Sequence, residues 1–118
     1  MAAPNLVSIG TVTAKTAVQA VTTSATAIAT NSASSGKAIK VSALYLSNIG
    51  SGDSAATVDI DMYRSSTAYH IAKTISIPAD TSLDVISKSV FLEEGDSLRL
   101  TASANGFIEA VCSYEEIS

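Results

Sequence analysis

The sequence is short of several residue types. Its 118 residues include one cysteine, no tryptophan, two phenylalanines and two prolines. A single cysteine excludes an intrachain disulfide and a cysteine-rich metal site. Cys112 lies in an apolar alternation with Ile108 and Ala110, so we expect a buried thiol that packs in the core. With so few aromatic residues, the core is predicted to be small and aliphatic.

Charge is sparse as well. Seven Lys and Arg stand against eleven Asp and Glu, and the basic residues do not cluster. Nucleic-acid binding needs a basic patch that neutralises phosphates, so no nucleic-acid partner is predicted. No stretch approaches the roughly 20 apolar residues of a membrane span, and the first four residues lack the features of a signal peptide. We therefore expect a chain made in the cytoplasm, without a membrane partner.

Alternation of apolar and polar residues is the main positive signal. Leu98, Leu100 and Ala102 alternate with polar neighbours, as expected of a half-buried strand. This strand follows the acidic turn Glu93–Asp96 and precedes Asn105-Gly106, a dipeptide that favours a type I′ hairpin. The C-terminal third is thus predicted to be antiparallel β-structure.

Further strands are predicted upstream. Ala56 to Tyr63 alternates so that Asp59 and Asp61 face water. The other predicted strands are two or three short ones within Asn5–Thr30, then Ala38–Asn48, Thr67–Ile77 and Ser82–Val90, the last with a bulge near Ile86. The chain length fits one domain. We therefore predict an all-β fold: a single antiparallel β-sandwich or jelly-roll-like domain of about eight strands at residues 15–118, preceded by an N-terminal arm at residues 1–14.

The residues that could suggest a catalytic or metal-binding site also have structural explanations. The one histidine, His70, falls inside a predicted strand, and no Gly-x-Ser-x-Gly elbow accompanies it. Oxygen ligands for calcium could come from Asp59 and Asp61 with Asp53 or Asp84, but no spaced acidic loop supports such a site. Glycine at a positive φ explains the acidic turn around Gly95 without a metal. The sequence predicts no catalytic residues, no cofactor, no metal and no enzymatic activity.

Two kinds of binding remain. The tyrosines 45, 63, 69 and 114 could form a carbohydrate platform, and Tyr63 and Tyr69 are the candidates for an exposed aromatic contact. Alternatively, a Ser- and Thr-rich, weakly charged surface suits protein assembly, because burying it against a partner desolvates little charge. An N-terminal arm with little core of its own fits this second hypothesis. The candidate intersubunit contacts are Leu6, Val7, Ile9 and Val12.

Three segments carry a resemblance to a known group of proteins. Tyr63–Ala72, Ile77–Val85 and above all Leu92–Leu100, where an acidic Gly-Asp turn precedes a Leu-x-Leu strand, resemble small virion structural proteins of tailed bacteriophages, especially cyanophages. The resemblance covers Gly36 to Ser118. It implies a non-enzymatic all-β component of the virion that is built in the infected bacterial cytoplasm.

The resemblance leaves two positions on the particle open. A capsid decoration or cement protein would bind the head shell, often as a homotrimer, and would bridge neighbouring capsid subunits. A tail or baseplate accessory would act as an adaptor and could contact a host surface glycan. In both cases the implied partners are phage capsid or tail proteins and further copies of the chain, and no functional residue is carried over.

Overall fold

The computed structural model describes residues 4–50, 52 and 54–118. These residues form nine strands and no helix, which confirms the all-β sandwich fold. Residues 1–3 of the predicted N-terminal arm lie outside the described residues. So does Asp53, one of the carboxylates that could have supplied a calcium ligand. The strands are β1 (Val12–Val21), β2 (Thr26–Thr30), β3 (Ala38–Asn48), β4 (Ala56–Arg64), β5 (Thr67–Ile77), β6 (Ser82–Asp84), β7 (Val90–Leu92), β8 (Ser97–Ala102) and β9 (Ile108–Ile117).

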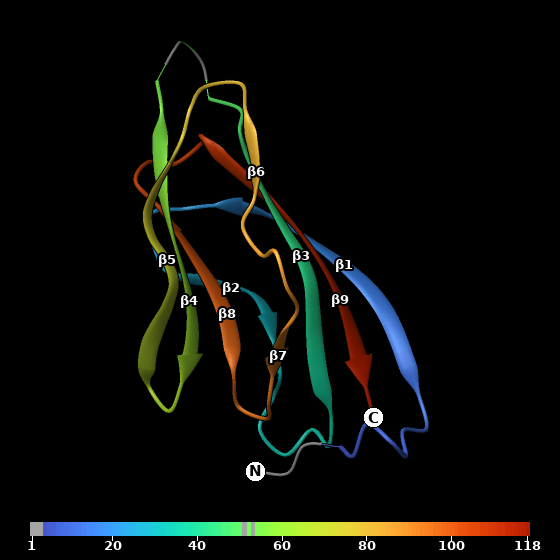
Figure 1. Cartoon of the computed structure of the whole chain (residues 1–118). Coiled ribbons are helices and arrows are strands. Elements are labelled where there is room, and N and C mark those ends of the chain that lie inside the picture. The colour runs from blue at the N-terminus through green and yellow to red at the C-terminus, as the bar shows by residue number, and fades with distance from the viewer. Residues whose placement is uncertain (1–3, 51, 53) are drawn as a thin grey trace.

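The strands form two antiparallel sheets that face each other (Figure 1). Sheet A has the order β1-β9-β3-β6, with β7 also paired to β3, and sheet B has the order β2-β8-β4-β5. Strands β6 and β7 pair with the same edge of β3, so they act as two halves of one interrupted strand. Counted that way, each sheet has four strands and the chain repeatedly crosses between sheets. This is the strand order of a jelly roll.

The core between the sheets is aliphatic, as the composition predicts. Its largest fully buried side chains come from both sheets and include Ile39, Leu44, Ile60, Leu98 and Leu100. Burying each such side chain stabilises the fold by about 1.5–3 kcal/mol. Cys112 is fully buried beside the buried Ile108 and Ala110 of β9, so the predicted packing role of its thiol is confirmed.

Several predicted elements agree with the structure. Strands β3 and β5 have the predicted bounds, and β5 ends immediately before Pro78. Gly95 in the acidic turn has the predicted positive φ, at 89°. The N-terminal region forms two strands, and the first of them has ten residues. Because β1 begins at Val12, the last three residues of the predicted arm belong to the sandwich.

The predicted strand Ser82–Val90 is wrong as one element. The structure has β6 and β7 instead, separated by Val85–Ser89. Ile86 in this connection is buried, and Val85 donates its N–H to the carbonyl of Leu44 at 3.0 Å. The chain thus leaves the sheet to place Ile86 in the core and then rejoins β3.

The predicted type I′ hairpin at Asn105-Gly106 is also wrong. Strand β8 belongs to sheet B and β9 to sheet A, so this turn crosses between the sheets. Of Asn105 and Gly106, only Gly106 has a positive φ, whereas a type I′ turn needs two such residues in succession. That geometry occurs at Ser65 and Ser66, with φ of 51° and 61°, in the two-residue loop between β4 and β5.

Two buried asparagines fix the loops at opposite ends of β3. Asn31, directly after β2, donates from Nδ2 to the carbonyls of Lys37 and Leu92 at 2.8 and 2.9 Å. Asn48, the last residue of β3, donates to the carbonyls of Ser54 and Ile77 at 3.0 and 2.9 Å. Each amide satisfies one carbonyl in a loop and one at the end of a strand.

Candidate interaction surface

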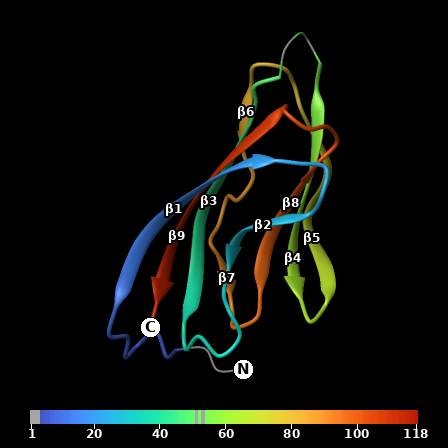
Figure 2. The same cartoon turned by 180° about the vertical axis from the view of Figure 1, so that it is seen from behind.

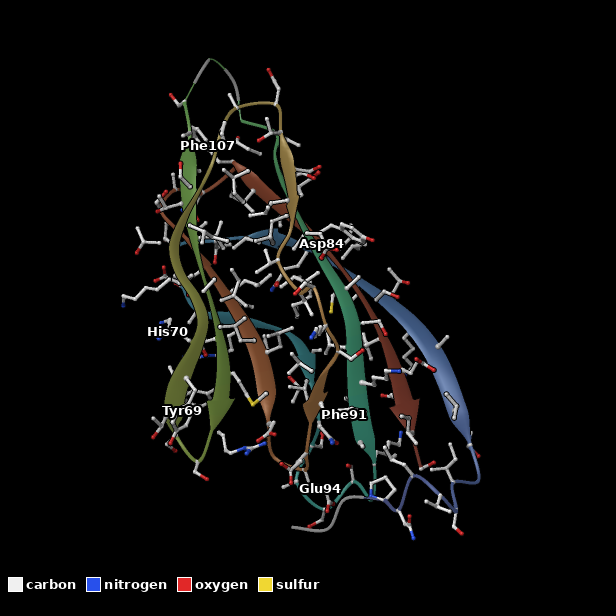
Figure 3. The ribbon with its side chains drawn as sticks, in the orientation of Figure 1. Tyr69, His70, Asp84, Phe91, Glu94 and Phe107 are labelled. Carbon is white, nitrogen blue, oxygen red and sulfur yellow. The ribbon has the colours of Figure 1, made fainter. Side chains whose placement is uncertain are left out.

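The titratable side chains do not form a reactive constellation in the described part of the chain. No group of three or more His, Cys, Asp or Glu there is placed to hold a metal ion. His70 is exposed on β5 (Figure 3). The strand register places it opposite Asp61 of β4. The absence of catalytic residues and cofactors stays a prediction.

The prediction that Asp61 faces water is wrong. Asp61 is only 3% exposed, and its Oδ1 accepts a 2.9 Å hydrogen bond from Nε of Arg99 on the neighbouring strand β8. The Arg99 guanidinium also lies over the ring of Tyr63, with its central carbon 3.9 Å from the ring centroid. A long side chain on an adjacent strand therefore covers a carboxylate that the alternation pattern places on the outer face.

Asp59 has a structural role too. Its Oδ1 accepts a 2.7 Å hydrogen bond from the N–H of Thr74 on β5. Thr74 has a positive φ of 54° where the register between β4 and β5 shifts. Asp59 therefore stabilises a bulge between β4 and β5.

The acidic turn contains a second ion pair. Asp96 is fully buried, and its carboxylate accepts hydrogen bonds from Nε and Nη2 of Arg64 and from the N–H of Glu93. The hydrogen bonds from Arg64 hold the pKa of Asp96 below its ordinary value of 3.8, although burial acts in the opposite direction. Glu94 accepts a 2.9 Å hydrogen bond from the N–H of Gly36. The acidic residues of this turn thus fix the loops around it.

The tyrosines do not form one platform. Tyr63 lies opposite Ala68 and Tyr69 lies opposite Met62, so their side chains point to opposite faces of the β4–β5 ladder. Tyr45 and Tyr114 belong to sheet A instead. Tyr69 is well exposed near the tip of the β4–β5 hairpin (Figure 3). Tyr63 is half-buried, and Arg99 lies over its ring.

The outer face of sheet A carries an exposed apolar row. Val18 of β1 pairs with Val111 of β9, which pairs in turn with Tyr45 of β3. These side chains are 76%, 39% and 47% exposed, and we call them the sheet A row. The flanking rows hold small or polar residues, namely Ala20, Glu109 and Ser47 on one side and Thr16, Ser113 and Ala43 on the other. Sequence reasoning missed this row, because its members come from three strands whose order only the fold reveals.

The predicted intersubunit contacts lie at one end of the same sheet. Leu6, Val7, Ile9 and Val12 are all exposed, Val7 to 93%. Gly10 and Thr11 both donate their N–H groups to the carbonyl of Ser118, which fixes the residues before β1 beside the C-terminus (Figure 1). The structure therefore places this apolar segment at the start of an edge strand.

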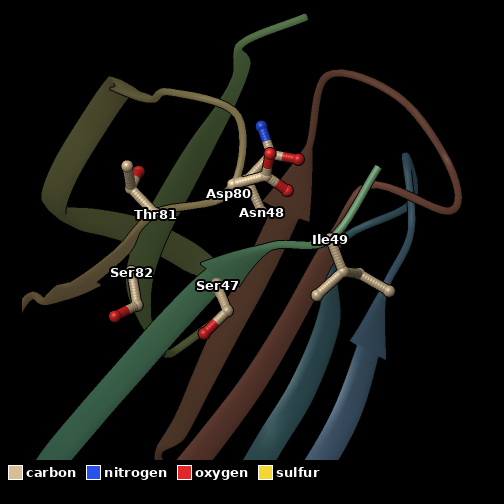
Figure 4. Close-up of a pocket in the computed structure, with 6 residues that line it drawn as sticks. All are labelled: Ser47, Asn48, Ile49, Asp80, Thr81 and Ser82. Atoms are coloured by element: carbon tan, nitrogen blue, oxygen red, sulfur yellow. The ribbon is translucent and has the colours of Figure 1, made fainter. Parts of the chain in front are cut away.

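Two of the shallow hollows on the described surface lie near strands of sheet A. One, of 260 Å³, is lined by residues of β1 and β9, namely Val18, Gln19, Ala20, Glu109, Ala110 and Val111. The other, of 430 Å³, lies where β3 meets the loop before β6 (Figure 4). There the amide of Asn48 is already occupied by backbone groups. The first hollow adjoins the sheet A row.

Comparisons with known proteins bear on the fold alone. No protein family and no curated protein matches the sequence. One similar solved structure is a protein of Bacillus endospore appendages, which are described as a novel family of disulfide-linked pili. Its TM-score is 0.52 at 16% sequence identity, over 90% of this chain and 85% of that chain. In the described residues we find no helix that could cross a membrane. The chain shares a β-sandwich fold with a pilus protein.

Proposed function

We propose that this chain is a non-enzymatic structural protein of a tailed-bacteriophage virion that binds the head shell as a decoration or cement protein. The observation that carries the proposal is the sheet A row, in which Val18, Val111 and Tyr45 are exposed together. Apart from Asp84, which pairs with Tyr45, and Glu109, the residues around this row are small or uncharged, so covering it would remove apolar surface from water with little desolvation of charge. The phage-like segments in the C-terminal two thirds support the same role.

The mechanism is repeated binding. A small domain offers a modest interface, and an isolated interface of that size gives only weak association. Many copies on a symmetric shell act together, because each contact raises the effective concentration of the next. The shell is stabilised by the sum of these contacts without a chemical reaction.

The fold is compatible with this role but does not assign it. Jelly rolls occur in viral capsid proteins and also in lectins and cupins. The similar pilus protein belongs to an assembly described as disulfide-linked. In this chain the single cysteine is fully buried, so in the folded protein we expect contacts between subunits to be non-covalent.

We further propose that the apolar segment before β1 contributes to an intersubunit contact through Leu6, Val7 and Ile9. A truncation that tests this contact should remove residues 1–9 and keep the chain from Gly10 onward. Gly10 and Thr11 donate hydrogen bonds to Ser118, and Val12 begins β1. We expect this truncated protein to fold normally and to bind particles more weakly. Unchanged oligomeric state and particle binding would refute this contact.

A tail or baseplate adaptor is the second candidate. The exposed ring of Tyr69 near the hairpin tip favours it, since aromatic faces stack on sugars. On a glycan array, binding that is lost in the Tyr69→Ala variant would support this candidate. Binding that survives that change, or no binding at all, would count against a glycan contact through Tyr69.

Gold-labelled antibody on purified phage particles tests the proposed function directly. Label over the head would support decoration, and label confined to the tail would favour the adaptor. Particles without label would refute a virion role.

A further inference from the structure

Strand β1 has an edge that no strand in the described part of the chain covers. It lies at the end of sheet A and pairs only with β9, in an unbroken register of ten residue pairs (Figure 2). The other sheet edges are interrupted: β2 has five residues and a register shift, β5 has shifts near Thr74, and β6 and β7 are separated. Edge strands of natural proteins are commonly protected by such irregularities, and β1 has none.

The phase of hydrogen bonding shows which backbone groups are free. Thr11 and Ser118 exchange both N–H···O=C bonds, each at 2.9 Å. In an antiparallel ladder such pairs alternate with pairs whose backbone groups point outward. The residues with N–H and C=O groups directed away from β9 are therefore Val12, Ala14, Thr16, Val18 and Ala20.

These five residues carry no protection against pairing. None is charged or a proline, and charges or prolines are the usual means of blocking an edge. The one charged residue of the strand, Lys15, alternates to the opposite face, where its Nζ lies 3.2 Å from Oε1 of Glu116. The free edge of β1 is thus long, regular and neutral.

We propose that β1 pairs antiparallel with β1 of a second copy, about a two-fold axis at Thr16. This deepens the proposed assembly function by naming one partner and its contact. Two identical edges that pair about a two-fold axis form an isologous interface. Each copy then satisfies the free backbone N–H and C=O groups of the other.

Overlap and charge together select the register, because only an axis at Thr16 lets all five free-edge residues of one copy pair with those of the other. With Thr16 opposite Thr16 of the second copy, the strands overlap from Val12 to Ala20 and Lys15 faces Ala17. Moving the two-fold axis from Thr16 to Lys15 would place Lys15 directly opposite Lys15 of the second copy. Like charges in that position are destabilising. The chosen register also places Val18 beside Ala14 of the second copy, which extends the sheet A row across the two-fold axis.

Cysteine cross-linking tests the register on the full chain. Thr16 would form a hydrogen-bonded pair with itself at a Cα separation of about 5.5 Å, within the range of a disulfide. Thr16→Cys should therefore give a covalent dimer under mild oxidation. Val12→Cys alone should not, because its two copies would lie about 27 Å apart along the strand, at roughly 3.4 Å per residue. A mixture of Val12→Cys and Ala20→Cys should cross-link.

Sedimentation of the wild-type chain and of Thr16→Pro supplies the second measurement. Proline at this position removes a free-edge donor without removing a hydrogen bond to β9, and native burial of Cys112 checks that the variant folds. We expect a wild-type dimer and a monomeric variant. A wild-type monomer or trimer, a variant that stays dimeric, or equal cross-linking of Val12→Cys alone would overturn the inference.

The two proposals fail separately. Gold label on particles with no self-association in solution would refute only the β1 pairing. Self-association without label on particles would refute only the virion role.

Discussion

Arg64 and Asp96 form an ion pair between the end of β4 and the turn that precedes β8. Nε of Arg64 donates to Oδ1 of Asp96 at 2.8 Å, and Nη2 donates both to Oδ2 of Asp96 and to Glu93. The carboxylate is fully buried, whereas the Arg64 side chain is partly exposed. The pair fixes the crossing from sheet A to sheet B at one end of the sandwich.

Removing this carboxylate should destabilise the protein. Breaking a buried ion pair costs about 3–5 kcal/mol, and we expect about 2–4 kcal/mol for Asp96→Asn because Arg64 keeps partial access to water. Denaturant unfolding measures the change. The control Glu93→Gln removes the exposed partner of the same arginine and should cost less than about 1 kcal/mol. Equal costs for the two variants would contradict a dominant role of Asp96.

The same pair predicts acid sensitivity. Hydrogen bonds from Arg64 lower the pKa of Asp96 in the folded protein below 3.8, the value expected when it is unfolded. Its contribution is therefore complete above about pH 4 and is lost as pH falls through the lower, folded pKa. The difference in unfolding free energy between wild type and Asp96→Asn should shrink below pH 4. A constant difference down to pH 2 would exclude this linkage.

Cys112 should report on opening of the fold. Burial raises the pKa of its thiol to about 11, and the side chain has no access to solvent. Since the thiolate is the reactive form, a disulfide reagent should label the native protein only as fast as it opens. Val18→Cys, at an exposed position of the outer face, should react at once. Immediate reaction of wild-type Cys112 would show that β9 is not stably packed.

Sequence patterns predicted the strands better than their arrangement. The bounds of β3 and β5 follow from local alternation and from Pro78, which are properties of neighbouring residues. The sheet to which β8 and β9 belong depends on packing across the core, so Asn105-Gly106 was wrongly predicted as a hairpin. Asp61 was misplaced for a similar reason, because its cover comes from Arg99, 38 residues away. The sheet A row combines three such distant strands.

The β4–β5 turn should tolerate better turn residues. Ser65 and Ser66 adopt left-handed conformations that cost L-residues other than Gly, Asn and Asp roughly 1–2 kcal/mol each. Replacing them by Asn-Gly, the preferred type I′ pair, should raise the unfolding free energy by about 1 kcal/mol or more. Thermal unfolding measures this gain. A double alanine variant at the same positions should show no stabilisation, and a similar gain there would refute the turn argument.

Gly50 should resist any side chain because of Phe107. A Cβ atom at Gly50 would lie 2.5 Å from a ring carbon of Phe107. The backbones of the two segments are joined there, because the Phe107 carbonyl accepts a 2.7 Å hydrogen bond from the N–H of Ile49. Overpacking of this kind costs about 1–3 kcal/mol, so Gly50→Ala should lower the unfolding free energy by that amount. In a Phe107→Ala background the clash is absent, and the added cost of Gly50→Ala should fall to a few tenths of a kcal/mol. A double-mutant cycle by denaturant unfolding gives the coupling. If the two changes were additive, the contact between ring and glycine would not be the cause.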